Sequence, residues 1–221
     1  MAETPQTKKV LYTKEPLERY LEDAAAGTPT PGGGSVSALV GALATTMANM
    51  TANMTIGRPE FKETEAVLNG MNQDIQRMRT EFLGLMHKDM EVYQAVLDAY
   101  RLPKSTPEEK GRRSQAIQSA LKRAMEVPLQ TARISLNLLE HAHKMVDISN
   151  PNLLGDVVVS SILANAALLG GKVNVEVNLA LIKDEDLVKK TRQEILQAAK
   201  RGQVLLEEVM KKVERVTSKA S

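Results

Sequence analysis

The sequence predicts an all-α fold, an antiparallel helical bundle with two buried uncharged helices and one long central helix. Aromatic residues make up 3% of the 221 residues, Trp is absent and Met occurs 11 times, a composition typical of helices packed on Ala, Leu and Met. Two long stretches lack charge, and a third carries apolar residues at helical spacing. No repeat or compositional boundary divides the chain, so we expect a flexible arm over residues 1–12 and one domain over residues 13–221.

The first uncharged stretch lies between Asp23 and Arg58, and it opens with the Pro- and Gly-rich turn Thr28–Gly34. Ser35 is the expected N-cap of a helix that runs to Ile56. The stretch is long enough to cross a bilayer, but its Thr and Asn residues favour a helix buried in protein. We therefore expect no membrane segment.

A long central helix is predicted from Phe61 to Tyr100, and Pro103 should end it. Its stripe of core positions consists of Met71, Ile75, Met78, Phe82, Leu85, Asp89, Val92, Val96 and Ala99. Asp89 is the one member of that stripe that is not apolar.

The second half of the chain should hold four more helices. Thr106–Glu109 combines a capping hydroxyl, a first-turn proline and a capping-box glutamate. The helix that follows should bend or break at Pro128 and resume to about Val146. Asp184 opens the last, amphipathic helix. Between Val146 and Asp184 we expect an uncharged helix over 154–169, closed by Gly170 and Gly171. An extended crossing segment should follow over 172–179, where polar and apolar residues alternate.

Charge and composition exclude several classes of protein. A formal net charge of +2, with basic and acidic residues interleaved, argues against a nucleic-acid partner. The absence of Cys removes disulfides, thiol catalysis and thiolate metal sites. It also fits a reducing compartment, and the polar N-terminus lacks a signal-peptide core, so we expect a cytoplasmic protein. His87, His141 and His143 have no metal-ligand spacing, and no metal is expected.

Gly32, Gly33 and Gly34 are candidate binding residues, because they lead into a helix whose first N–H groups have no partner within the helix. Glycines let the backbone approach a ligand closely, and the helix dipole favours a carboxylate or a polarised carbonyl there. The structural alternative is a tight turn that lets two helices pack.

Asp89 is the first candidate catalytic residue. A carboxylate at a core position must be paired, protonated or used. Desolvation raises its pKa toward the range in which acid–base catalysis works near neutral pH. The alternative is a structural ion pair with an Arg or Lys of a neighbouring helix.

Asp156 is the second candidate, at the start of the second uncharged helix, where N-terminal capping is the plain alternative. Both uncharged helices keep polar side chains, which predicts either a shared polar pocket or a hydrogen-bonded seam. These side chains are Thr45, Asn49, Asn53, Ser160, Ser161 and Asn165.

The run Pro29–Ser35 (PTPGGGS), followed by an Ala-rich helix ending in Asn53–Gly57 (NMTIG), resembles the signature of formiminotetrahydrofolate cyclodeaminases and the related methenyltetrahydrofolate cyclohydrolases. Later segments agree with it: DMEVY at 89–93, YRLP at 100–103, AMEVP at 124–128, and Asp156 with NVEVN at 174–178. Two positions depart from the family pattern. Gly155 stands where the family often has Ser, and Arg58 where it often has Lys.

The resemblance implies an all-α homodimer that acts on a tetrahydrofolate, often polyglutamylated, with no metal and no cofactor beyond that substrate. It makes Asp89 and Asp156 the catalytic pair, and either can be the acid or the base. It also implies two groups of binding residues: Gly32, Gly33, Gly34, Ser35, Asn53, Asn174 and Asn178 orient the folate, while Arg58, or else Arg112 or Arg113, meets glutamate carboxylates.

The expected reaction is that of a methenyltetrahydrofolate cyclohydrolase, in which water opens 5,10-methenyltetrahydrofolate to 10-formyltetrahydrofolate. All 221 residues belong to one unit without a formiminotransferase domain, which favours this reaction over the alternative. That alternative is a formimidoyltetrahydrofolate cyclodeaminase, which releases ammonia and gives 5,10-methenyltetrahydrofolate. A further alternative is a non-catalytic helical interaction protein, in which Asp89 is salt-bridged and no cleft joins it to the glycine turn.

Overall fold

The computed structural model describes residues 10–218, so residues 1–9 of the expected flexible arm lie outside the described residues. The described chain is all-α, as predicted, and contains no strand. Its α-helices are α1 (Leu17–Ala25), α2 (Gly33–Thr55), α3 (Glu65–Arg101), α4 (Pro107–Ile148), α5 (Leu154–Leu179) and α6 (Glu185–Thr217). Three short 3-10 helices accompany them: η1 (Tyr12–Lys14), η2 (Pro59–Phe61) and η3 (Pro151–Leu153).

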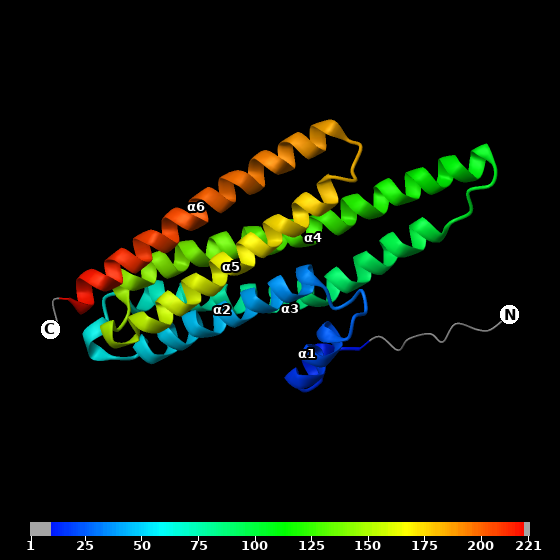
Figure 1. The fold of residues 1–221 in the computed structure, drawn as a ribbon. Helices are drawn as coiled ribbons and strands as arrows, with labels where there is room; N and C mark the ends of the chain where they lie inside the picture. The colour runs from blue at the N-terminus through cyan, green and yellow to red at the C-terminus, as the bar shows by residue number, and fades with distance from the viewer. Residues whose placement is uncertain (1–9, 219–221) are drawn as a thin grey trace.

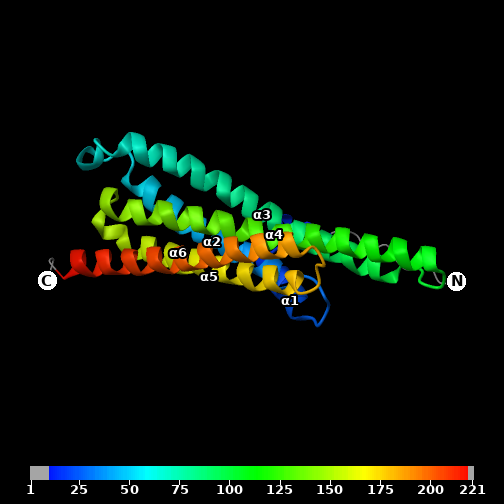
Figure 2. The ribbon, with the colours of Figure 1, turned by 90° about the horizontal axis from the view of Figure 1, so that it is seen from above.

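Helices α2, α3, α4 and α5 form an antiparallel bundle in which each helix packs on the next and α5 returns to pack on α2 (Figure 1). Helix α6 packs on both α4 and α5. The α3–α4 hairpin extends beyond the ends of the other helices, as both views of the ribbon show (Figure 1, Figure 2). Helix α1 stands outside the bundle and is anchored by Tyr20, which is buried against Ala38 and Met86.

Helix α2 begins three residues earlier than the sequence suggests. Its N-cap is Gly32, in extended conformation, and its first residue is Gly33, so the prediction that Ser35 is the N-cap was wrong. Ser35 lies instead in the first turn, where backbone N–H groups have no partner inside the helix. Its N–H donates to Asp89 of α3, and its hydroxyl bonds to Tyr20 of α1, so Ser35 joins three helices instead of capping one.

Helix α4 is one continuous helix of 42 residues. It begins with the predicted capping box, in which the Thr106 hydroxyl and the Glu109 carboxylate each accept a backbone N–H of the other residue. The prediction of a break at Pro128 was wrong. Pro128 is buried and its carbonyl lies against Gly171 of α5, so tertiary packing offsets the hydrogen bond that a proline removes.

Helix α5 contains the segment 172–179, which the alternating pattern assigned wrongly to an extended chain. Val175 and Leu179 are buried in the core, while Val173 and Val177 are exposed on the opposite side. A helix that is apolar on two faces gives the same alternation as a strand. Gly170 and Gly171 do not end the helix either.

The close packing around α5 explains why these two glycines are needed inside a helix. A Cβ atom on Gly171 would stand 2.8 Å from the Pro128 carbonyl oxygen and 3.2 Å from the Ala132 Cβ, while one on Gly170 would collide with the Ser37 hydroxyl. The glycines therefore let α5 approach α4 and α2 closely.

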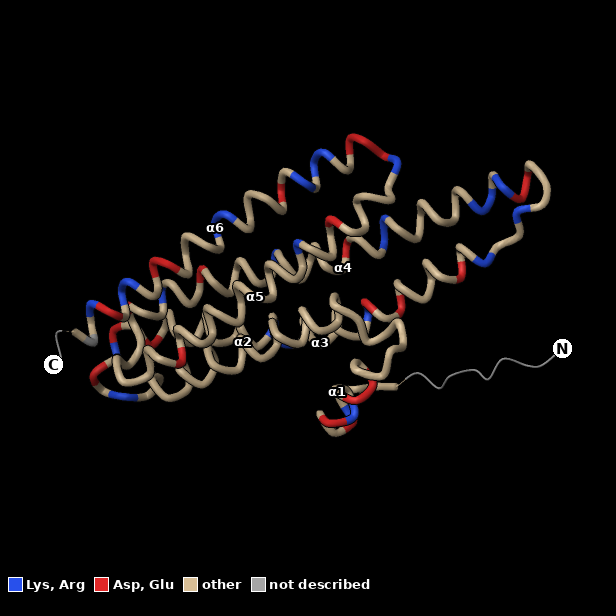
Figure 3. Tube along the Cα trace, in the orientation of Figure 1, with Lys and Arg blue, Asp and Glu red and all other residues tan. Residues whose placement is uncertain are grey.

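Helices α2 and α5 each bury one side and expose the other. Helix α2 carries no charged residue in its whole length (Figure 3), whereas α5 carries Asp156, Lys172 and Glu176. The exposed large apolar residues of this pair form what we call the α2–α5 face: Val36, Leu43, Met54, Val159, Ile162, Leu169, Val173 and Val177. Within the described residues, Pro151–Leu179 is the single helix long and apolar enough to cross a membrane, and half of its most apolar part is buried inside the bundle. The same properties are found in the core helices of water-exposed bundles.

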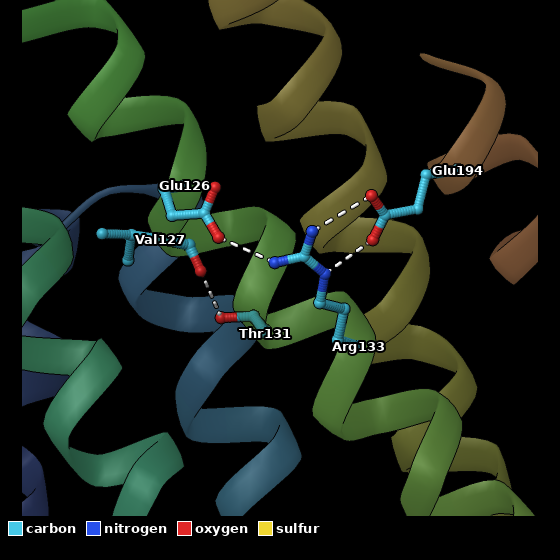
Figure 4. A network of polar contacts seen from close by, with 5 residues as sticks. All are labelled: Glu126, Val127, Thr131, Arg133 and Glu194. Atoms are coloured by element: carbon cyan, nitrogen blue, oxygen red, sulfur yellow. Dashed lines mark hydrogen bonds and ion pairs between the residues drawn. The ribbon is translucent and has the colours of Figure 1, made fainter. Parts of the chain in front are cut away.

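Helix α6 is held to α4 by a charged contact centred on Arg133 (Figure 4). The Arg133 guanidinium donates two hydrogen bonds to Glu194, at 2.6 and 3.0 Å, and a third to Glu126 at 2.7 Å. The paired guanidinium keeps the pKa of the Glu194 carboxyl below its ordinary value. This bidentate geometry fixes the position of α6 along the bundle.

Candidate functional site

The carboxylate of Asp89, on α3, lies directly against the first turn of α2. The Ser35 N–H donates a hydrogen bond to Asp89 Oδ2 at 2.9 Å. A Cβ atom on Gly34 would stand 2.6 Å from Asp89 Cγ, so only glycine leaves room for the carboxylate there. The predicted glycine turn and the predicted core carboxylate therefore form one site.

Two opposing effects set the acidity of this site. Burial raises the pKa of the Asp89 carboxyl above its ordinary value, while the hydrogen bond from Ser35 acts in the opposite direction because it stabilises the ionised form. The positive end of the α2 dipole also favours the ionised carboxylate. No described residue forms an ion pair with Asp89.

Tyr20 is a member of this site that sequence analysis missed. Its hydroxyl lies 2.9 Å from the Ser35 hydroxyl, and both side chains are buried. Burial raises the pKa of Tyr20, the Ser35 hydrogen bond opposes that shift, and the nearby Asp89 charge adds to it. Leu17, Tyr20, Leu21 and Ala24 give α1 an apolar stripe at helical spacing, but that stripe does not show which helix Tyr20 contacts. The connected series Tyr20, Ser35 and Asp89 links α1, α2 and α3.

Asn174 brings α5 to the same place. A Cβ atom on Gly33 would lie 3.4 Å from Asn174 Nδ2. The Asn174 and Asn178 amides donate to the carbonyls of Gly170 and Asn174 at 2.8 and 2.9 Å. Their side-chain oxygens accept no hydrogen bond from the described residues, and they remain available as acceptors.

The structure places Asp156 at the other end of the α2–α5 pair. The two helices run antiparallel, since Ser160 donates to the Ala44 carbonyl at 2.8 Å while Gly170 meets Ser37. Asp156 lies one turn beyond Ser160, away from Asp89. At 1.5 Å per residue, the two carboxylates are separated by about 20 Å along the pair. They do not meet within one chain.

Asn53 and Arg58 also lie at that far end, in the last turn of α2 and just after it. Asn53 accepts a hydrogen bond from Asn72 of α3 at 2.7 Å. The sequence-predicted residues thus divide into two groups within one chain. Asp89, Gly32–Gly34, Ser35, Asn174 and Asn178 lie at one end, and Asn53, Arg58 and Asp156 lie at the other.

The polar side chains of α2 and α5 form a hydrogen-bonded seam only in part, since the buried side-chain oxygens of Asn49 and Asn165 accept no hydrogen bond from the described residues. Asn49 of α2 donates to the Asn72 side chain of α3 at 2.7 Å. Ser160 joins α5 to α2 through its bond to Ala44, and Ser161 and Thr45 donate to carbonyls within their own helices. The Asn49 and Ser160 contacts therefore join neighbouring helices, whereas those of Ser161 and Thr45 do not.

A cavity of about 630 Å³ lies beside the site, between α1, η1 and α3. Tyr12, Arg19, Asp23 and His87 line part of its wall. The Tyr12 hydroxyl donates to Asp23 at 2.8 Å, and burial, followed by this contact, raises the pKa of Tyr12 to about 12. Among residues 10–218 no group of three or more His, Asp and Glu side chains is arranged to hold a metal ion.

Comparison with known proteins gives a consistent set of relatives. The model of the formiminotransferase-cyclodeaminase family matches residues 16–197. The chain is 34% identical to the methenyltetrahydrofolate cyclohydrolase of Methylorubrum extorquens, over 82% of this chain and 87% of that protein. It is 32% identical to the formimidoyltransferase-cyclodeaminase of Rattus norvegicus, over 83% of this chain but only 35% of that protein.

A solved structure has the same fold. The formiminotetrahydrofolate cyclodeaminase of Thermotoga maritima superposes with a TM-score of 0.77, at 29% identity, over 93% of this chain and 96% of that one. The structural similarity therefore extends over nearly the whole chain.

Proposed function

The chain belongs to the formiminotransferase-cyclodeaminase family, and we propose that it is a folate-dependent one-carbon enzyme that hydrolyses 5,10-methenyltetrahydrofolate to 10-formyltetrahydrofolate. The observation that carries the chemical part is the desolvated Asp89 carboxylate, held by the Ser35 N–H and unpaired by any described cation. The cyclohydrolase reaction is favoured because the chain is 34% identical to the Methylorubrum enzyme, over 87% of that protein, and 29% identical to the Thermotoga cyclodeaminase.

Asp89 can perform the proton transfers of this reaction. Its carboxylate takes a proton from water as the oxygen attacks the methenyl carbon between N5 and N10, and its negative charge stabilises the cationic amidinium before attack. The protonated Asp89 then gives that proton to N5 as the bond between the carbon and N5 breaks. The remaining hydroxyl proton passes to solvent, which leaves the formyl group on N10. A raised pKa suits a carboxyl that must hold a proton between these steps.

The neighbouring groups position the folate. The N–H groups of the Gly32–Gly34 turn and the open side-chain oxygens of Asn174 and Asn178 are hydrogen-bonding groups of opposite polarity around Asp89. The pteridine carries both donors and acceptors on one edge, so this arrangement can orient it. No cofactor beyond the folate is needed for these steps.

The cyclodeaminase reaction remains the second candidate because the Thermotoga structure carries that name. In that reaction N10 attacks the formimino carbon and ammonia leaves, and Asp89 acts as the acid on the departing nitrogen. The non-catalytic alternative predicts a salt-bridged Asp89, whereas Asp89 forms no ion pair with a described cation.

We also propose that the protein is a homodimer that pairs through the α2–α5 face. Many exposed large apolar side chains on two adjoining helices are typical of a protein interface. A symmetric dimer also resolves the split between Asp89 and Asp156. A twofold axis across this face can bring Asp156, Asn53 and Arg58 of one copy toward Asp89 of the other.

An absorbance assay of the purified protein tests the reaction. With 5,10-methenyltetrahydrofolate in excess, the protein should speed the loss of the methenyl chromophore, and 10-formyltetrahydrofolate should be the product. Ammonia release from 5-formimidoyltetrahydrofolate, with no effect on methenyl hydrolysis, would support the cyclodeaminase instead. If neither folate is turned over, and neither raises the melting temperature through binding, the non-catalytic alternative is correct.

A further inference from the structure

We propose that Tyr20 is a positioning residue of the reaction: its hydroxyl holds the first turn of α2 so that the Ser35 N–H stays directed at Asp89. This inference rests on the proposed function and deepens it, because it adds a residue of α1 to the groups on which turnover depends. Tyr20 acts through Ser35 and leaves the proton transfers to Asp89.

Two hydrogen bonds of Ser35 join Tyr20 to Asp89. The Tyr20 hydroxyl lies 2.9 Å from the Ser35 hydroxyl, and the Ser35 N–H donates to Asp89 Oδ2 at 2.9 Å. Ser35 is fully buried and Tyr20 is 3% exposed, so solvent has little access to the bond between the two hydroxyls. Because both bonds start from one residue in a helix, a movement of the Ser35 side chain also redirects its N–H.

The Ser35 hydroxyl has no second partner in the part of the chain that the structure describes. A serine inside a helix often donates to the carbonyl four residues earlier, as Ser37 does to Gly33 at 2.7 Å. For Ser35 that position is Pro31, which precedes the helix. Removal of the Tyr20 hydroxyl therefore leaves a buried hydroxyl unpaired, which is costly and favours a shift of the turn.

The first turn of α2 depends on such outside contacts because it has few restraints of its own. Its N-cap is Gly32, and no side chain caps the helix, although a capping side chain normally stabilises a helix start. Gly33 and Gly34 follow, and glycine gives the backbone more conformational freedom than any other residue. The two bonds of Ser35 therefore supply the restraint that the glycine turn lacks.

Helix α1 is attached to the bundle around Tyr20. The Tyr20 ring is buried against Ala38 of α2 and Met86 of α3. Leu17 and Leu21, the other large apolar side chains of α1, are exposed at 62% and 57%. The ring therefore fixes the place of α1, and the hydroxyl is left to act on Ser35. These two roles can be separated by a substitution that keeps the ring.

The test is Tyr20→Phe, which keeps the buried ring and removes the hydroxyl. With 5,10-methenyltetrahydrofolate as substrate, kcat should fall about fivefold, the usual effect of one lost hydrogen bond. The KM should change by less than about twofold, because no contact to the substrate is removed. The matched control is Tyr12→Phe. The Tyr12 hydroxyl donates to Asp23 at 2.8 Å, outside the series that leads to Asp89, so both constants should keep their wild-type values.

The pH profile distinguishes positioning from a purely structural role. Within the described residues, burial and the Ser35 N–H set the pKa of the Asp89 carboxyl, and Tyr20 is the titratable group that faces it from another helix. The Ser35 bond lowers the pKa of Asp89, so weakening it in Tyr20→Phe should move the acid side of the kcat profile to higher pH. A variant that loses stability but keeps the wild-type kcat and profile would overturn the inference.

A double variant tests whether Tyr20 and Ser35 act through one bond. Ser35→Ala removes the other hydroxyl of the pair and keeps the N–H. Tyr20→Phe combined with Ser35→Ala should be no slower than the slower single variant, because both changes break the same contact. Losses that multiply would mean that the two hydroxyls act separately, and they would contradict the inference.

If the wild type turns over neither folate, the proposed function fails, and the positioning role is then tested without turnover. NMR titration measures the pKa of the Asp89 carboxyl in the wild type and in both tyrosine variants. A higher pKa in Tyr20→Phe, with the wild-type value in Tyr12→Phe, supports the positioning role. The same pKa in all three proteins refutes it.

Discussion

The carboxylate of Asp89 occupies the space that any side chain at position 34 would need. A Cβ atom added to Gly34 would stand 2.6 Å from Asp89 Cγ, well inside van der Waals contact, and the Ser35 N–H next to it donates to Asp89 Oδ2 at 2.9 Å. The glycine turn is therefore matched to one carboxylate on another helix. A change at either residue must displace the other.

Replacing Gly34 with Ala should remove activity without unfolding the protein. The added methyl group forces Asp89 away from the Ser35 N–H, and a displacement of about 1 Å at a reacting group can lower turnover by about 100-fold. Overpacking of this kind costs about 1–3 kcal/mol in the free energy of unfolding. Steady-state kinetics and urea unfolding measure the two effects.

The matched control is Gly84→Ala, on the same helix as Asp89. Nothing lies within 4 Å of a Cβ at Gly84, so the change should leave kinetics unaltered and should stabilise the helix by about 0.5–1 kcal/mol. Full activity in Gly34→Ala would mean that the contact between the turn and Asp89 has no part in catalysis.

The raised pKa of Asp89 predicts how stability depends on pH. An acid whose pKa is higher in the folded than in the unfolded protein binds more protons when folded. Its contribution is therefore fully present below the unfolded pKa and is lost as pH rises through the folded pKa. The unfolding free energy of the wild type should fall relative to that of Asp89→Asn over that window, and then level off. Denaturant unfolding of both proteins at a series of pH values measures these free energies. A wild type that gains stability relative to Asp89→Asn as pH rises would contradict the assigned shift.

The proposed dimer should dissociate when a charge is placed on the α2–α5 face. Val173 is 59% exposed in the single chain, so Val173→Glu should not disturb the fold of the monomer. A carboxylate buried in the interface without a partner is costly, and sedimentation equilibrium should report the mass of one chain. Val204→Glu, at an exposed position on α6, should leave the dimer intact. A wild type that sediments as a monomer contradicts the proposal.

Mixing two inactive variants tests whether Asp156 acts across the dimer. After Asp89→Asn and Asp156→Asn are unfolded and refolded together, half of the dimers should be mixed, each with one complete site. Activity should then return to about a quarter of the wild-type value, since a symmetric dimer has two equivalent sites. If native mass spectrometry detects mixed dimers but activity stays absent, Asp156 has no role in trans.

The contact between α4 and α5 predicts a purely structural effect. A Cβ on Gly171 would stand 2.8 Å from the Pro128 carbonyl oxygen, so Gly171→Ala should lower the free energy of unfolding by about 1–3 kcal/mol. Gly155→Ala lies on the same helix with nothing within 4 Å of the new atom and should cause no loss. Equal stabilities of the two variants, measured by thermal unfolding, would disprove the close approach of α4 and α5.

Much of the fold could be predicted because local signals and tertiary packing agree. The apolar stripe of α3, the capping box of α4 and the start of α6 at Asp184 were all expected, and Asp184 accepts the Leu187 N–H at 3.1 Å as an N-cap should. The errors arose where packing overrides a local rule. Pro128 stays inside a helix, and the alternating segment 172–179 is helical because both of its faces are apolar.

The site was predicted in part. A charged residue on an apolar stripe identified Asp89, and helix-start chemistry identified the glycine turn beside it. No pattern along the chain gives the register of two antiparallel helices, so the separation of Asp156 from Asp89 emerged only from the contacts of Ser160 and Gly170. The role of Tyr20 depends on how α1 folds back onto α2, which sequence periodicity does not encode.

The most direct test of the account is the turnover of 5,10-methenyltetrahydrofolate by Asp89→Asn, compared with Asp98→Asn at an exposed position of the same helix. Loss of a general acid–base group should lower kcat at least about 100-fold, while Asp98→Asn should keep the wild-type rate. An Asp89→Asn variant that is folded and turns over the substrate within a few-fold of the wild type would show that this carboxylate does not carry the chemistry.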